Sequence, residues 1–246
     1  MFNQNPVISE EVLQRYQTID AKPMTIQGTL IKTAILLIIM MIPAFVTWYQ
    51  FFLGYTDKVN IMVIAGLVIG LISALIIILK NSLSPYIAPI YAFAEGTTLG
   101  GVSVFFEMVY PGIAIQAISC TMMVAFSSLI LYKSGLIKVT EKFRSVISMA
   151  LSSIFLIYLS SFIMNCFNKE IPYLFGSNPI GIAFSILVII VAALTLLIDF
   201  DFIEKGSAKF LPKYMEWYAG FSILMTIIWL YIEIINLLAK IYDRNR

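Results

Sequence analysis

Long uncharged stretches dominate this chain of 246 residues. A helix needs about 20 apolar residues to cross a bilayer, so each such stretch is predicted to form one transmembrane helix. The five stretches cover residues 33–56, 59–79, 108–132, 145–168 and 171–198. Two further apolar segments, 86–107 and 215–239, have the length of a span but contain acidic residues. The sequence therefore predicts an all-α polytopic membrane protein, a bundle of seven transmembrane helices.

The composition supports one membrane domain and leaves no room for a soluble second domain. Hydrophobic residues make up 60% of the chain and charged residues 12%, against about 45–50% and 25% in soluble domains. We expect a cytoplasmic N-terminal segment over 1–32, a transmembrane domain over 33–240 and a short polar tail over 241–246. Residues 1–32 lack the basic opening and cleavage site of a signal peptide, and the spacing of Val12, Leu13 and Tyr16 suggests a short amphipathic helix.

The distribution of lysine and arginine predicts the orientation. Seven spans place the termini on opposite sides, and the N-terminal side carries eleven basic residues against five. The positive-inside rule then places the N-terminus in the cytoplasm, with the chain in the inner (plasma) membrane. The three basic residues of the C-terminal stretch, Lys240, Arg244 and Arg246, argue weakly for the opposite orientation.

Several function classes lack the residues they need. The chain has no histidine, which removes the commonest metal ligand, the commonest general base and the usual pH switch near neutrality. No hydrolase, protease or nucleotide-binding motif occurs, so we expect no enzyme and no cofactor. No basic stripe suggests nucleic acid as a partner. Cys120 and Cys166 lie in apolar runs and are expected to be small buried hydrophobes.

Small residues recur at helical spacing within two spans. Gly66 and Gly70 form one GxxxG pair, and Gly96 and Gly100 form another. We interpret both as points of close helix approach rather than binding sites.

Acidic residues inside the spans are the strongest candidates for function. An ionised carboxylate near the bilayer centre costs roughly 2.5–3.5 kcal/mol on insertion scales, yet Glu95 and Glu233 lie well inside their segments and Glu107 ends one. The functional interpretation is a water-filled path along which carboxylates bind a hard cation or exchange protons. The alternative is a protonated acid that hydrogen-bonds a neighbouring helix. A second acidic cluster, at the predicted cytoplasmic end of the bundle, contains Asp199, Asp201, Glu204 and Glu216.

Several motifs resemble one known family. The closing stretch Leu230–Leu238 reads LYIEIINLL and is similar to the LYLDFINLF of the Bax inhibitor-1 family, with Glu233 in place of its aspartate. The string IDFDFIEKG, from Ile198 to Gly206, resembles the end of that family's sixth helix. Further similar stretches are EGTTLGGVSVFFEMVYPG (95–112), NPV (5–7), MTIQGTLIKT (24–33) and KYMEWY (213–218).

The resemblance implies a seven-helix fold with the last helix at its centre. It also implies a calcium leak gated by two acids that share protons, which here would be Asp199 (or Asp201) with Glu233. A rise of about 1.5 Å per residue separates these acids by up to roughly 20 Å in depth. Two other pairings therefore stay open: Asp199 or Asp201 with Glu216, and Glu95 with Glu233. Ca²⁺ binding is considered at Glu95, Glu233 and Asp199.

These observations lead to one functional hypothesis and two rivals. The hypothesis is a pH-sensitive passive leak for Ca²⁺, with lipid, Ca²⁺ and protons as the partners of the chain. The first rival is a non-conducting interaction protein that modulates a membrane-bound protease or a stress response. The second is a proton-coupled transporter of a small solute.

Overall fold

The computed structural model describes residues 23–167, 174 and 176–245, and these residues form seven long α-helices and one short 3-10 turn. Six of the helices are long and apolar enough to cross a membrane, and these are α2, α3, α5, α6, α7 and α8. The helices are α2 (Ile26–Phe52), α3 (Thr56–Leu79), α4 (Ser84–Val109), α5 (Ile113–Lys133), α6 (Glu141–Cys166), α7 (Pro179–Ala208) and α8 (Met215–Arg244), with the turn η1 (Asn81–Leu83). The all-α polytopic fold is confirmed.

The remaining long helix, α4, has 26 residues but is richer in small and polar side chains. It packs against α2, α3 and α8, and most of its residues from Tyr91 to Gly100 are buried. Neighbouring helices therefore cover most of the middle of α4, whereas its acids Glu95 and Glu107 are half-buried.

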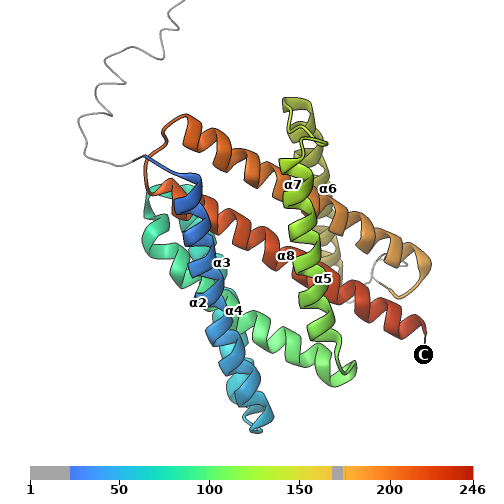
Figure 1. Cartoon of the computed structure of the whole chain (residues 1–246). Coiled ribbons are helices and arrows are strands. Elements are labelled where there is room, and N and C mark those ends of the chain that lie inside the picture. The colour runs from blue at the N-terminus through green and yellow to red at the C-terminus, as the bar shows by residue number, and fades with distance from the viewer. Residues whose placement is uncertain (1–22, 168–173, 175, 246) are drawn as a thin grey trace, which may run out of the picture.

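Helix α8 lies at the centre of the bundle, as the resemblance implies. It packs against α2, α4, α5 and α7, and Figure 1 shows it running between the α2–α4 group and the α5–α7 group. In its apolar part 61% of the residues are buried, the largest share among the six candidate spans. Helix α6 lies at the periphery, where it packs against α7.

Two helices, α2 and α7, begin at side-chain caps rather than at the ends of the uncharged runs. Helix α2 begins seven residues before the predicted span because the Thr25 side chain accepts a hydrogen bond from the Gly28 backbone N–H. Helix α7 begins at Pro179, after Asn178 caps it, and continues to Ala208. Uncharged runs mark the part of a helix in hydrocarbon, whereas the helix itself extends into the polar interface. The predicted start of this span at 171, like the predicted helix around Val12, lies outside the described residues.

The two GxxxG pairs do bring helices together. A Cβ atom on Gly66 would lie 2.6 Å from the Ala94 carbonyl oxygen of α4. One on Gly100 would lie 2.5 Å from the Ala44 carbonyl oxygen of α2. The packing interpretation is confirmed for both pairs. The expectation that both cysteines are buried is wrong: Cys120 is half-buried, and Cys166 is exposed at the end of α6, where a small apolar side chain can face lipid.

Four segments meet at one end of the bundle, which we call the basic end: residues 23–32, 80–84, 132–144 and 199–216. Near Pro23, which bridges to Pro212, the Met24 backbone N–H donates to the Leu211 carbonyl oxygen at 2.7 Å. The Ser84 hydroxyl donates to the Tyr214 carbonyl oxygen at 3.1 Å. These contacts join α2, α4 and α8 at the end of the molecule where most of the lysines and arginines lie.

Candidate ion path: buried acids with and without cationic partners

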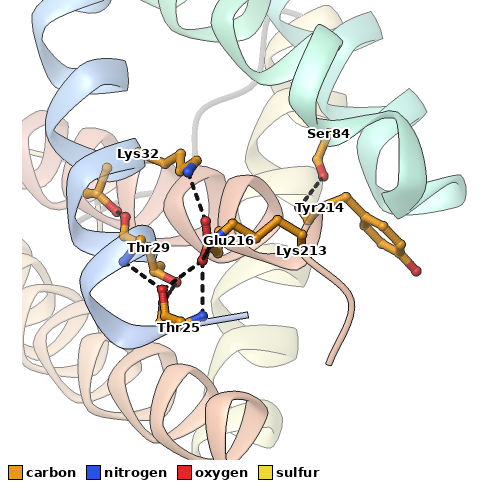
Figure 2. A network of polar contacts seen from close by, with 9 residues as sticks. Thr25, Thr29, Lys32, Ser84, Lys213, Tyr214 and Glu216 are labelled. Atoms are coloured by element: carbon orange, nitrogen blue, oxygen red, sulfur yellow. Dashed lines mark hydrogen bonds and ion pairs between the residues drawn. The ribbon is translucent and has the colours of Figure 1, made fainter. Parts of the chain in front are cut away.

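Glu216, on the first turn of α8, is fully buried and surrounded by cations and donors. Its carboxylate lies 2.8 Å from the Lys32 Nζ atom and 2.6 Å from the Lys213 Nζ atom. The backbone N–H and the hydroxyl of Thr25 both donate to it, at 3.0 and 2.9 Å. Figure 2 shows these groups converging on Glu216 from α2 and from the turn before α8. This acid is a structural ion-pair centre that ties the start of α2 to α8.

The sequence makes room for this carboxylate with a glycine. A Cβ atom on Gly28 would overlap the Glu216 carboxyl group, so the close approach of α2 depends on the missing side chain. Thr25 serves both ends of the contact, because its hydroxyl caps α2 through the Gly28 N–H and donates to Glu216. The MTIQG motif is therefore explained by this packing.

Asp201, near the end of α7, is also neutralised by cations. It forms ion pairs with Arg144 of α6 and, at 2.8 Å, with Lys205 one helical turn further on. The neighbouring Glu204 accepts a hydrogen bond from the Tyr132 hydroxyl of α5. These contacts fasten α5 and α6 to α7 at the basic end.

Asp199 has a different environment from Asp201, although only one residue separates them. Its two carboxylate oxygens accept hydrogen bonds from the hydroxyls of Ser222 at 2.7 Å and Thr226 at 2.8 Å. Its side chain is buried between α7 and α8, and within the described residues it forms no salt bridge. Ser222 and Thr226 lie one turn apart on α8, so both hydroxyls face α7.

Glu233 lies buried in the second half of α8 and contacts aromatic donors. The Tyr158 hydroxyl of α6 donates to it at 2.7 Å, and the Trp229 indole N–H donates at 3.2 Å. Lys240 lies two turns further along α8, but its ammonium donates to the Gly181 carbonyl and the Ser185 hydroxyl of α7. Glu233 therefore has neutral donors and, in the described part of the chain, no ion pair.

Glu95 and Glu107 lie on α4 and differ in role. The Glu95 carboxylate rests against α3, where a Cβ atom on Gly70 would lie 2.6 Å from it, and no ion pair reaches it from the described residues. Glu107 caps α5, because its oxygens accept from the backbone N–H groups of Gly112 at 2.6 Å and Ala114 at 3.1 Å.

The structure brings none of the predicted acid pairs together. Asp199 lies opposite Ser222 and Thr226, and Glu233 is seven residues beyond Thr226, about 10 Å further along α8. This offset is about half of that predicted, because α7 continues well past Asp199. Glu216 contacts neither Asp199 nor Asp201, and Glu95 does not contact Glu233. Among the described residues, no group of three acidic, cysteine or histidine side chains could hold a metal ion, so Glu95, Glu233 and Asp199 do not form one calcium site.

Sequence reasoning missed the partners of the acids. The Lys32–Glu216 and Arg144–Asp201 contacts join residues far apart in the chain, and no local sequence pattern predicts them. The sequence contained one indication of the hydroxyls opposite Asp199: the i, i+4 spacing of Ser222 and Thr226 places them on one face of α8.

Together the fold and its buried acids define a class: a polytopic helical membrane protein with carboxylates inside the bundle. The chain belongs to the Bax inhibitor 1 like family, whose model matches residues 5–243. The match covers nearly the whole chain and confirms the resemblance seen in the motifs. No curated protein and no solved structure matched the chain.

Proposed function

We propose that this protein is a passive, pH-sensitive leak for Ca²⁺ whose ion path passes Glu95, Asp199 and Glu233. The observation that carries the proposal is the division of the acids into two groups. Glu216 and Asp201 have cationic partners, and Glu107 caps a helix. The other three, Glu95, Asp199 and Glu233, form no ion pair within the described residues, and the donors that contact Asp199 and Glu233 are neutral hydroxyl and indole groups.

Carboxylates of this kind suit a hard cation. Ca²⁺ binds oxygen ligands, above all carboxylates, and a buried carboxylate with no counter-ion is costly unless a cation or a proton neutralises it. The three acids lie on three helices, α4, α7 and α8, and at least Asp199 and Glu233 lie at different depths. Separate stations suit a permeating ion, which must bind weakly enough to leave each of them.

Protonation would control such a path. A protonated carboxyl group loses the charge that attracts Ca²⁺, so we expect the flux to rise with pH. Without histidine in the chain, these carboxylates are the groups that would sense protons inside the bundle.

Calcium flux into liposomes that contain only the purified protein tests the proposal. The flux is measured from about pH 5 to 8 for the wild type, for Glu233→Gln and for Glu141→Gln, an exposed acid at the start of α6 that serves as the matched control. We expect a pH-dependent flux that Glu233→Gln reduces and Glu141→Gln leaves unchanged. A folded wild type with no flux at any pH would overturn the proposal and favour a non-conducting interaction protein.

A further inference from the structure

A cavity of about 420 Å³ lies between α2 and α5, with α4 and α8 at its floor. Its size falls within the ~300–1,000 Å³ of small-molecule sites. Phe45 of α2 and Ile115 of α5 are exposed at its edges, whereas Leu99 and Tyr231 are buried at its base. The cavity is thus a deep groove that opens sideways from the bundle, and none of the ion-path acids lines it.

The hydroxyls of the groove are already bonded within the protein. Ser103 and Tyr231 contact each other at 2.6 Å, and Ser103 also donates to the Leu99 carbonyl. Thr121 donates to the Ala117 carbonyl at 2.7 Å. The remaining lining is mostly apolar, so water would find few partners there. An apolar chain fits these walls better than water.

One end of the groove carries a negative charge. Glu107 lines it there, two residues before the end of α4, and in the described part of the chain no cation pairs with this carboxylate. Trp48 of α2 lines the groove as well, four residues before the end of its helix. Tryptophan near a span end marks the level of the lipid head groups. The charge therefore lies where a head group would be.

We propose that this groove holds one acyl chain of a membrane phospholipid whose ammonium-bearing head group, as in phosphatidylethanolamine, lies beside Glu107. The bilayer supplies the chain from the open side between α2 and α5. The ammonium complements this carboxylate, which accepts two backbone N–H groups of the α5 start but has no cationic partner among the described residues. This lipid site does not depend on the proposed calcium leak.

Photocrosslinking in liposomes tests the proposal. The probe is phosphatidylethanolamine with a diazirine in one acyl chain, and the labelled residues are mapped by mass spectrometry of peptides. Met122 lines the groove and its neighbour Met123 does not, although both are exposed on α5. We expect labelling to concentrate on the groove residues, Met122→Trp to remove most of it, and Met123→Trp to leave it unchanged.

The head group is tested with the same probe carried on phosphatidylglycerol. An exposed charge contact contributes about 0.2–1 kcal/mol, so Glu107→Gln should lower the preference for the ammonium head group by roughly up to fivefold. Two results would overturn the lipid site. One is labelling of the groove residues that is no stronger than labelling of Met149, which faces lipid on α6. The other is a Met122→Trp variant that is labelled as strongly as the wild type. Equal labelling by both head groups in the wild type would overturn the role of Glu107. An unlabelled groove together with a dimer that Met122→Trp dissociates would instead identify a second copy as the occupant.

Discussion

At the scale of single residues, the surroundings of each acid separate the carboxylates with cationic partners from those without them. Asp199 and Asp201 illustrate this division, since both are buried near the end of α7. Asp201 is paired with two cations, whereas Asp199 receives two hydroxyl hydrogen bonds. The two aspartates are similarly buried, so it is their hydrogen-bond and ion-pair partners that distinguish them.

Glu216→Gln should destabilise the protein. The change leaves the ammonium groups of Lys32 and Lys213 without their counter-ion, but these side chains remain 21% and 43% exposed and can contact water. We therefore expect a loss of about 1–3 kcal/mol, below the full cost of breaking a buried pair. Thermal unfolding in detergent measures the loss, with Glu141→Gln as the control. Equal melting temperatures for the two variants would contradict a structural role for Glu216.

At the scale of helices, backbone contact at glycines sets how closely α4 approaches α2. A Cβ atom on Gly96 would overlap the Met40 carbonyl oxygen and lie 2.6 Å from Pro43. Gly101 provides a matched comparison, because the one atom within 3.0 Å of a Cβ added there is a methyl carbon of the Val63 side chain. A side chain can rotate away, whereas a helix backbone cannot.

Gly96→Ala should therefore cost more stability than Gly101→Ala. Overpacking costs typically about 1–3 kcal/mol, which exceeds the gain of up to about 1 kcal/mol in helix propensity from glycine to alanine. Thermal unfolding of the two variants gives the comparison directly. If Gly101→Ala proved the more damaging of the two, the close approach of α2 and α4 would be misassigned.

Helix α6 depends on a few contacts for its position. Ile154 packs with Val188 and Val191 of α7, Tyr158 reaches Glu233, and Arg144 pairs with Asp201 at the basic end. The rest of the helix exposes large apolar side chains, which suits a helix that faces lipid.

Arg144→Gln should loosen the start of α6 without unfolding the bundle. Lys205 remains beside Asp201, so the expected loss is only about 1 kcal/mol and is confined to the first turns of α6. Hydrogen exchange over 141–147 should become faster than in the wild type. Lys142→Gln, which removes an exposed charge on the same turn, should exchange like the wild type; faster exchange in both variants would assign the effect to charge rather than to the contact.

At the scale of the whole molecule, the basic end predicts how the chain lies in the membrane. The segments that gather there hold most of the lysines and arginines, and α8 begins there and ends at the other end of the bundle. We expect the protein to lie in the inner membrane with its N-terminus in the cytoplasm. A phosphatase that folds only outside the cytoplasm should be active when it is fused after Arg246. A fluorescent protein that does not fold after export should give no fluorescence when it is fused at the same position. The reverse pattern would contradict this orientation.

Five of the seven described helices follow from the sequence because each matches a long uncharged run, and α4 and α8 follow from the two apolar segments that contain acids. The central place of α8 followed from the resemblance rather than from the residues. The helix starts did not follow from the uncharged runs, since the cap Thr25 lies before its run and the cap Asn178 lies several residues inside its run. The partners of the acids did not follow either: Lys32 and Glu216 meet only through the packing of α2 on α8, which no local pattern specifies.

The central claim, that the acids without cationic partners carry the calcium leak, is tested most directly by comparing Asp199→Asn with Asp201→Asn in the same liposome assay. An asparagine at 199 can keep hydrogen bonds to Ser222 and Thr226 but has no charge for Ca²⁺. We predict that Asp199→Asn greatly reduces the flux and its pH dependence, whereas Asp201→Asn retains both. Wild-type flux through Asp199→Asn, or loss of flux in Asp201→Asn alone, would contradict the account.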